Sequence, residues 1–399
     1  MKEGWEYKKL GEITTTINGL WTGKKPPFIN VAVVRNTNFT KDCKLDMTNV
    51  AYLDVEQKQY STRKLLPGDI IIEKSGGSDK QPVGRPVLFN IAEGEFSFSN
   101  FTCTLRIINS NLISPVFLHY ALFGAYLRGD TFKMQSKTTG IHNLDFKAYN
   151  RLQIPIPPLT EQQRIVEELD LLSSIIEKKK EQLKELDALA QSLFYDMFGD
   201  PVTNEKGWEV TTLNDVCISM VRGPFGSALK KEYFVEKGDN TYKIYEQKHA
   251  IQKSAIIGTY YISKEKYEEL QRFEVFPNDI IMSCSGTIGE LFIIPNNAEK
   301  GIMNQALLKF TLDSKKVDSF YFLFIMQYVK RNMSVHGSGL QNIGSVKTIK
   351  GLCLGLPPLP LQQQFAQKVE AIERQKELIK QSIAETETLF NSRMDYYFN

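Results

Sequence analysis

The sequence contains the same ordered series of landmarks twice, about 200 residues apart. Three such pairs are Gly4-Trp5-Glu6 with Gly207-Trp208-Glu209, Gly68-Asp69-Ile70-Ile71 with Asn278-Asp279-Ile280-Ile281, and Ile156-Pro157-Pro158-Leu159 with Leu356-Pro357-Pro358-Leu359. The period is about half of the 399-residue chain, whereas solenoid repeats run roughly 20–50 residues. We therefore predict a protein that contains two copies of one fold.

Each copy opens with a region of mixed character, residues 1–155 and 200–356, which we expect to form a globule. Runs rich in β-branched residues, separated by Gly, Ser and Asn turns, predict strands. The clearest runs are 28–34, which Arg35 closes, 69–72, 102–107 and 306–310. Residues 115–127 and 317–329 are rich in Leu, Phe and Tyr and predict one core helix in each copy. The fold class predicted for both globules is α+β.

A long helix is predicted after each globule, over residues 156–199 and 357–399. Apolar side chains recur there at alternating spacings of four and three, which is the pattern of a coiled-coil seam. The expected seam residues are Ile165, Leu169, Leu172, Ile176, Leu183 and Leu186 in the first helix, and Phe365, Val369, Ile372, Ile379 and Ile383 in the second. Polar side chains interrupt the two seams at Lys179, Lys376, Thr386 and Arg393. Thr160 and Gln163 have the spacing of a capping box, and Gly199 is a helix-ending residue.

The two apolar seams require a partner. A helix of about 38 residues rises about 57 Å, at 1.5 Å per residue. One globule of this size does not cover so long a stripe, so the two helices are predicted to pack against each other as an antiparallel coiled coil. Parallel pairing, or pairing with another chain, is the alternative.

The motifs of common catalytic sites are absent from the sequence. It has no P-loop, no dinucleotide-binding G-x-G-x-x-G and no Asn-Pro-Pro-Tyr/Phe motif. Asp69, Glu73 and Lys74 lack the spacing of a nuclease cluster and are interpreted as charges at a strand edge. The five cysteines and four histidines do not group into a disulfide framework or a metal site. We expect a non-catalytic cytoplasmic protein with no membrane span and no cofactor or metal of its own.

The charge distribution favours contact between the globules and DNA. The whole chain carries only +3, but residues 1–155 carry +6 and 200–356 carry +2, whereas the helical segments carry −4 and −1. Polar and basic loops recur at matched places in the two globules, and their side chains are of the kinds that contact phosphates and base edges. Taken alone, each loop has the composition of an ordinary solvated loop. The candidate DNA-binding residues are Lys24, Lys25, Lys74, Gln135, Lys137, His142, Asn143, Arg222, Lys230, Lys231, His336, Gln341 and Asn342.

These features together resemble the specificity (S) subunit of type I restriction–modification enzymes. The segments that carry the resemblance are Ile154–Ile165, Leu356–Gln364, Gly207-Trp208 and Gly223–Lys230. The second copy departs from the pattern at Pro360-Leu361, where Thr-Glu is typical of the family.

The resemblance implies two target recognition domains, each of which reads one half of a split double-stranded DNA sequence. It implies a coiled coil that sets the gap and docks two methyltransferase (M) subunits, and restriction (R) subunits that join the complex. S-adenosylmethionine, ATP and magnesium would be bound by those partners. Two other interpretations remain open, a coiled-coil adaptor with peptide-binding globules and a fragment of a fused methyltransferase–nuclease.

Overall fold

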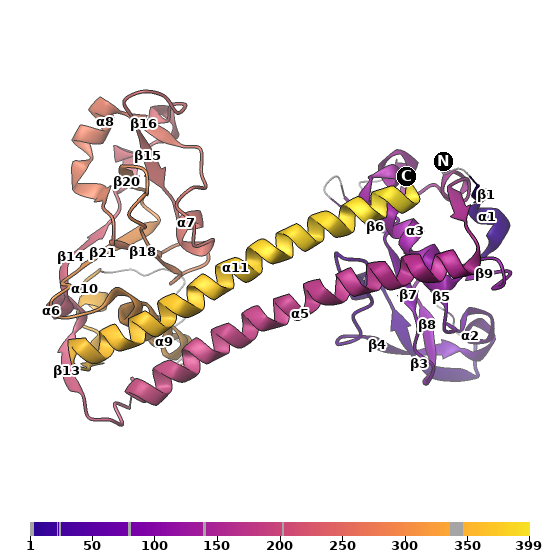
Figure 1. Cartoon of the computed structure of the whole chain (residues 1–399), viewed down its shortest axis with the longest axis horizontal. Helices are drawn as coiled ribbons and strands as arrows, with labels where there is room; N and C mark the ends of the chain where they lie inside the picture. The colour runs from indigo at the N-terminus through magenta and orange to yellow at the C-terminus, as the bar shows by residue number, and fades with distance from the viewer. Residues whose placement is uncertain are drawn as a thin grey trace. The chain divides into compact units, whose positions relative to one another are not determined.

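The computed structural model describes residues 4–21, 23, 25–78, 81–138, 141–201, 203–335 and 346–399. Contacts divide the chain into two compact units, Met1–Lys180 together with Gln381–Asn399, and Glu181–Lys380. Each unit therefore contains one globule, half of the first long helix and half of the second (Figure 1).

The globule of the first unit is built mainly of short strands. Its strands are β1 (Glu6–Lys9), β2 (Thr14–Asn18), β3 (Phe28–Val34), β4 (Ala51–Glu56), β5 (Asp69–Glu73), β6 (Ser75–Gly77), β7 (Pro86–Phe89), β8 (Phe96–Phe98), β9 (Thr102–Ile107), β10 (Gln135–Thr138), β11 (Ile141–Leu144) and β12 (Gln153–Ile156). Its helices are α1 (Leu10–Ile13), η1 (Asn36–Asn38), α2 (Gln57–Arg63), α3 (Pro115–Leu127), η2 (Asp130–Met134) and α4 (Phe146–Tyr149).

The globule of the second unit has a similar element order. Its strands are β13 (Glu209–Thr212), β14 (Cys217–Arg222), β15 (Thr241–Tyr245), β16 (Tyr261–Ser263), β17 (Glu274–Val275), β18 (Ile280–Ser283), β19 (Leu291–Ile293), β20 (Gly301–Met303), β21 (Leu307–Leu312) and β22 (Cys353–Leu356). Its helices are α6 (Leu213–Val216), η3 (Gly226–Ala228), η4 (Lys231–Tyr233), α7 (Gln247–Ile251), α8 (Lys264–Glu269), η5 (Gln271–Phe273), α9 (Ser319–Val335) and α10 (Val346–Lys350).

Sheet topology confirms the internal repeat. The main sheet has the order β2-β9-β5-β7 in the first globule and β14-β21-β18-β19 in the second. In both globules a second sheet contains a parallel strand pair, β3 with β8 and β15 with β20. The first and last strands also pair antiparallel in both, β1 with β12 and β13 with β22. The predicted α+β fold, made twice, is correct.

The long helices α5 (Leu159–Phe198) and α11 (Leu359–Phe398) pack against each other in antiparallel orientation (Figure 1). In the first unit the start of α5 meets the end of α11, where the Arg393 guanidinium bonds to the Glu168 carboxylate. In the second unit the end of α5 meets the start of α11, where the Lys376 Nζ atom lies 2.7 Å from an Asp187 carboxylate oxygen. The predicted antiparallel pairing is confirmed.

The ends of the two helices belong to the globular cores rather than to a free coiled coil. Ile165 and Leu169 of α5 and Phe390 and Met394 of α11 are buried in the core of the first globule, which also includes residues of α3. The predicted seam residues Ile165, Leu169, Phe365, Val369 and Ile372 are buried, and Leu172, Ile176, Leu183, Leu186, Ile379 and Ile383 are half-buried. Beyond Leu186 the most buried side chains follow a spacing of four, at Ala190, Phe194 and Phe198. The buried face changes there because Phe194 and Phe198 pack in the core of the second globule.

A buried glutamine joins the start of each long helix to its globule. The predicted capping box at Thr160 is wrong, because α5 begins one residue earlier, at Leu159. Instead, the Gln162 side chain is fully buried and makes three hydrogen bonds of 2.9 Å each, donating to the Leu112 and Pro157 carbonyl oxygens and accepting from the Ser114 N–H.

The second copy repeats this arrangement at Gln362. Its side chain is also fully buried, donates to the carbonyl oxygens of Lys316 and Pro357, and accepts from the Asp318 N–H. Both glutamines satisfy backbone groups where the chain turns from strand to helix, so they fix how each helix leaves its globule.

Candidate nucleic-acid interface

The end of the main sheet in the first globule forms a polar corner, made of Asn18, Lys74, Ser75 and Asn143. The Lys74 Nζ atom donates to the Asn18 side-chain oxygen at 3.3 Å. The Lys74 and Ser75 N–H groups both donate to the Phe101 carbonyl oxygen, which holds the turn from β5 into β6. The corner is therefore rigid in its backbone and presents ammonium, hydroxyl and amide groups.

A small sheet brings the other candidates of the first globule to this corner. Its strand order is β10-β11-β6, so Gln135 on β10 and His142 and Asn143 on β11 lie beside Ser75 on β6. The Ser75 hydroxyl bonds to the Asn143 side-chain oxygen, and the His142 Nδ1 atom lies 3.2 Å from the Gln135 side-chain oxygen. Lys74, Gln135, His142 and Asn143, predicted from distant parts of the sequence, are thus brought together.

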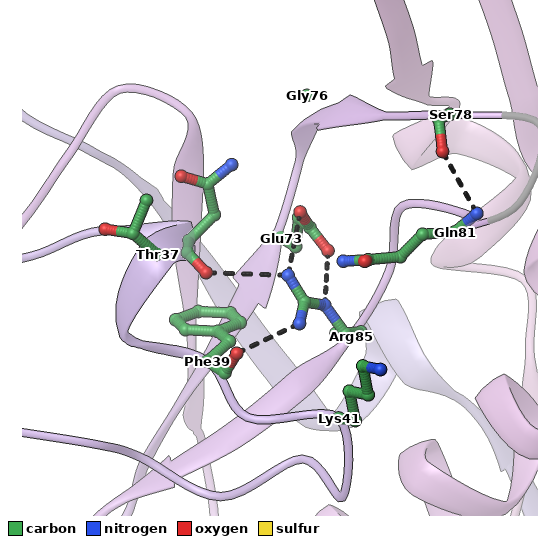
Figure 2. Close-up of a pocket in the computed structure, with 9 residues that line it drawn as sticks. Thr37, Phe39, Lys41, Glu73, Gly76, Ser78, Gln81 and Arg85 are labelled. Carbon is green, nitrogen blue, oxygen red and sulfur yellow. Dashed lines mark hydrogen bonds and ion pairs between the residues drawn. The ribbon is translucent and has the colours of Figure 1, made fainter. Parts of the chain in front are cut away.

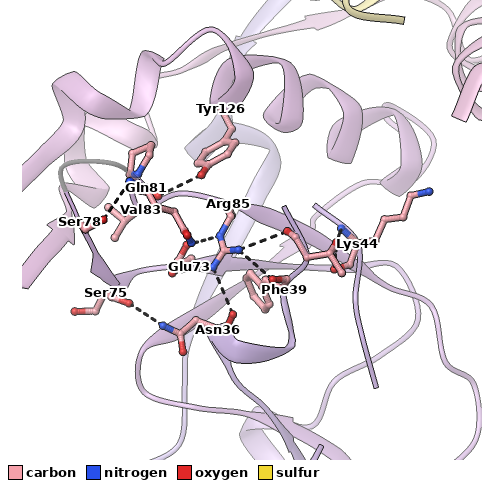
Figure 3. Close-up of polar contacts among 12 residues, drawn as sticks. Asn36, Phe39, Lys44, Glu73, Ser75, Ser78, Gln81, Val83, Arg85 and Tyr126 are labelled. Carbon is pink, nitrogen blue, oxygen red and sulfur yellow. Dashed lines mark hydrogen bonds and ion pairs between the residues drawn. The ribbon is translucent and has the colours of Figure 1, made fainter. Parts of the chain in front are cut away.

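A pocket of about 360 Å³ lies next to the corner (Figure 2). Its lining includes Asn36, Lys41, Gly76, Ser78 and Gln81. Glu73 and Arg85 also line it, and their side chains meet in a buried two-point ion pair with distances of 2.7 and 3.2 Å (Figure 3). Burial opposes the charge on Arg85, but the bonds to the Glu73 carboxylate outweigh it, so the pKa of Arg85 is raised.

The interpretation of Asp69 and Glu73 as strand-edge charges is wrong. Both carboxylates are about 1% exposed on β5, which lies between β9 and β7. Asp69 pairs with Arg106 through two bonds of 2.7 and 2.8 Å, as Glu73 pairs with Arg85. Each carboxylate is paired with an arginine and buried in the sheet, so these acids do not form a surface cluster.

The second globule has a matching corner. A Cβ atom added to Gly19 would lie 1.9 Å from the Ser99 carbonyl oxygen, and one added to Gly223 would lie 1.9 Å from the Asn304 carbonyl oxygen. Arg222, just before Gly223, donates from Nε to the Gln305 carbonyl oxygen at 3.3 Å. Burial raises the pKa of the neighbouring Cys284 thiol to about 11, with the Arg222 charge acting in the opposite direction.

The cation of the corner comes from different strands in the two copies. Asn18 and Arg222 each end the first strand of the main sheet, and the residues after β5 and β18 are Lys74 and Cys284. The first globule thus takes its cation from the turn after β5, and the second takes it from the end of β14. Both corners are basic, although the lysine and the arginine stand at different positions of the repeat.

The remaining candidates lie apart from these contacts or outside the described residues. The Lys25 N–H donates to the Glu56 carboxylate at 2.6 Å, which places Lys25 beside α2. Lys230 forms an exposed ion pair with Glu232, and Lys231 begins η4. Lys137 lies on β10, opposite His142. Lys24, His336, Gln341 and Asn342 fall outside the described residues.

Sequence reasoning missed Arg63. Its Nε atom donates to the carbonyl oxygens of Asn18 and Gly19, at 3.1 and 3.3 Å. Arg63 ends α2, a short polar helix that shows no motif, and only the folded chain brings it to Asn18, which Lys74 also contacts. It adds a second cation near the first corner.

The residues that interrupt the coiled-coil seam find partners on the opposite helix. The Lys179 Nζ atom donates to the Ser382 hydroxyl at 2.6 Å and to the Thr386 hydroxyl at 3.2 Å. Lys376 pairs with Asp187, and Arg393 pairs with Glu168. Polar pairs of this kind favour one register of two helices over its alternatives.

The described residues also bear on two other kinds of feature, a metal site and a membrane span. Within those ranges no three His, Cys, Asp or Glu side chains are grouped closely enough to hold a metal ion. Among the helices of the same part of the chain, none is long and apolar enough to cross a membrane.

This duplicated fold, with its two basic corners and its paired helices, defines a known class of DNA-specificity protein. Residues 2–187 and 205–388 match the family described as "Type I restriction modification DNA specificity domain". The two matches cover most of the chain, and the chain belongs to this family.

Individual relatives align with this chain over nearly its full length. The chain is 24% identical over 390 residues to the putative type I restriction enzyme MjaX specificity subunit of Methanocaldococcus jannaschii, which covers 93% of this chain and 87% of the relative. It is 25% identical over 422 residues to the type I restriction enzyme StySPI specificity subunit of Salmonella potsdam. That alignment covers 98% of this chain and 87% of the relative. The crystal structure of a type I S subunit from M. genitalium has the same fold, with a TM-score of 0.56, 13% identity, and coverage of 100% of this chain and 98% of that one.

Proposed function

We propose that this protein is the DNA sequence-recognition subunit of a type I restriction–modification complex, in which each globule reads one half of a bipartite duplex target. The observation that carries the proposal is the duplicated polar corner. Lys74 with Asn18 in one globule and Arg222 in the other present cations at the same end of the same sheet. A subunit that reads two half-sites needs two such surfaces, whereas an adaptor with peptide-binding globules does not.

The chemistry of the corners suits a nucleic acid. Lysine and arginine contact phosphates and guanine, and serine, asparagine and glutamine side chains both donate to and accept from base edges. Ser75, Gln135, His142 and Asn143 gather these donors and acceptors on one small sheet. The carboxylate of Glu73, the residue before Lys74, is bound to Arg85, so its charge is balanced within the chain.

We propose that the chain catalyses no step of methylation or cleavage. In this proposal S-adenosylmethionine, ATP and magnesium are bound by the partner subunits, and this chain supplies the sequence information. The proposal is supported by the absence of nucleotide-binding and methyltransferase motifs from the sequence.

The paired helices are proposed to set the gap between the half-sites and to bind two methyltransferase subunits, with restriction subunits joining the complex. A helix of 40 residues rises about 60 Å. Two major-groove sites one to two turns of DNA apart are separated by about 34 to 70 Å, which is the same range. The negative charge of the helical segments directs DNA to the globules and leaves the helix surfaces to proteins.

The proposal is tested by co-expressing the chain with its methyltransferase partner and sequencing the methylated genome. Gln135→Ala or His142→Ala is expected to change the bases accepted in one half of the target only, and Arg222→Ala to weaken the other half. Lys58, an exposed lysine that makes none of the contacts of the corner, is changed as Lys58→Ala for the control, which is expected to leave the target unchanged. A wild-type complex that methylates no bipartite sequence, or a single variant that alters both halves equally, would contradict the proposal.

A further inference from the structure

The residue that follows the parallel-paired strand carries opposite charge in the two globules. In the first globule Arg35 follows β3, and in the second Glu246 follows β15. The sequences around them are otherwise unlike, and the strands themselves share no motif. The structure makes the two positions comparable.

Backbone contacts establish that Arg35 and Glu246 are equivalent. The Ser99 N–H donates to the last carbonyl of β3 at 2.9 Å, and the Asn304 N–H donates to the last carbonyl of β15 at 2.9 Å. The Arg35 N–H then donates to the side chain three residues on, the Asn38 oxygen at 3.0 Å. The Glu246 N–H does the same with the His249 Nδ1 atom at 2.9 Å.

Both positions adjoin the proposed DNA-reading corners. The residue after Arg35 is Asn36, whose amide nitrogen donates to the Ser75 carbonyl oxygen at 3.5 Å (Figure 3). A Cβ atom on Gly76 would lie 2.9 Å from the same nitrogen. In the second globule the residue after Glu246 is Gln247, and a Cβ atom on Gly286 would lie 3.9 Å from its amide nitrogen. The same loop glycine therefore borders the site in each copy.

The polar atoms at these positions are incompletely satisfied within the chain. The Arg35 Nε atom is buried and has no hydrogen-bond partner in the structure. The Glu246 Oε2 atom, by contrast, is paired with the Lys248 ammonium, whose Nζ atom lies 2.5 Å away. The Gln247 side-chain oxygen also lacks a partner. Buried polar groups are normally satisfied, so the unpartnered atoms of Arg35 and Gln247 leave hydrogen-bonding capacity for a ligand beside each corner.

Resting on the proposed function, we infer that Arg35 and Glu246 are specificity-determining residues that read different bases at equivalent positions of the two half-sites. A guanidinium donates two hydrogen bonds to the O6 and N7 atoms of guanine. A carboxylate is repelled by phosphates and accepts from the N4 amino group of cytosine. Arg35 therefore selects guanine in the first half-site, and Glu246 selects cytosine in the second.

The test uses the chain co-expressed with its methyltransferase partner and reads the methylated sequences across the genome. Arg35→Gln is expected to relax one guanine position of one half-site, with preference for that base falling about 10- to 100-fold. Glu246→Gln is expected to relax one cytosine position of the other half-site. Glu246→Arg is expected to change the preferred pair at that position from C·G to G·C on the strand that is read, a gain that a misfolded variant cannot produce. Lys58→Gln on α2 and Glu268→Gln on α8 are exposed controls that leave both half-sites unchanged.

Three results would overturn the inference. The first is lower methylation of an unchanged target in the Arg35 and Glu246 variants, which indicates a structural role. The second is relaxation at both half-sites from one substitution. The third is a wild-type complex that methylates a bipartite target in which either half specifies no G·C pair. A wild-type complex that methylates no bipartite target contradicts the proposed function as well, so the two failures are distinguishable.

Discussion

Replacing Gln162 by leucine tests whether the buried glutamine holds the first long helix to its globule. Leucine has a similar volume but leaves the Leu112 and Pro157 carbonyl oxygens and the Ser114 N–H without their partner. A buried backbone group that loses its hydrogen bond costs about 1 to 3 kcal/mol. At the lower figure for each of the three groups, Gln162→Leu destabilises the first unit by about 3 kcal/mol.

The effect is measured by native-state hydrogen exchange with mass spectrometry, because this method reports each part of the chain separately. Exchange of amides in β12 and in the first turns of α5 is expected to become about 100-fold faster, since about 1.4 kcal/mol corresponds to a factor of ten. Amides of the second unit are expected to stay unchanged. The matched variant Gln362→Leu should accelerate exchange in the second unit and leave the amides of the first unit unchanged. The control is Gln163→Leu, whose exposed side chain donates to Glu167 on the same helix face, and it should shift exchange less than threefold.

The reasoning about the glutamine is refuted if Gln162→Leu accelerates exchange no more than Gln163→Leu does. It is also refuted if Gln162→Leu accelerates both units equally, because the contacts of Gln162 all lie in the first unit.

Three further predictions concern the first unit and the helix pair. Burial lowers the pKa of His119 to about 4, so the folded protein resists protonation of this side chain. The free energy of unfolding is therefore highest above pH 6.5 and falls by about 2 kcal/mol between pH 7 and 5. Urea denaturation should show this loss in the wild type and not in His119→Gln. Glu73→Gln leaves the buried Arg85 charge unpaired and is expected to destabilise the first unit by about 3 kcal/mol in urea denaturation, whereas Glu93→Gln, an exposed change, should have less than about 0.5 kcal/mol of effect. Lys376→Leu removes the pair with Asp187, so crosslinks between cysteines placed along α5 and α11 should show mixed registers; a single unchanged register would contradict this role.

Local patterns in the sequence predicted the repeat, the strands and the helices. The predicted segment 115–127 coincides with α3, and the strand that Arg35 closes ends at Val34. These features depend on spacing between near neighbours, which a sequence displays directly. The coiled-coil seam was predicted correctly along the middle of the two helices. At the ends of the helices the side chains pack on the globules instead of on the other helix.

Features that depend on distant partners could not be predicted. Glu73 and Asp69 have the composition of surface charges until the fold brings Arg85 and Arg106 against them. The equivalence of Arg35 and Glu246 depends on parallel pairing with strands more than 50 residues away in the sequence. Gln162 stands among other polar residues, and only its burial distinguishes it from Gln163.

The central claim is that the paired helices set the gap between two half-sites read by the globules, and lengthening the helices tests it most directly. Because α5 and α11 are antiparallel, seven residues are inserted into both, after Lys180 and after Lys380, which preserves the heptad seam. Each insertion adds about 10.5 Å, the rise of about three base pairs. Methylome sequencing of the complex is expected to show the same two half-sites separated by a gap about three base pairs longer. An unchanged gap, or altered half-sites, would contradict the account.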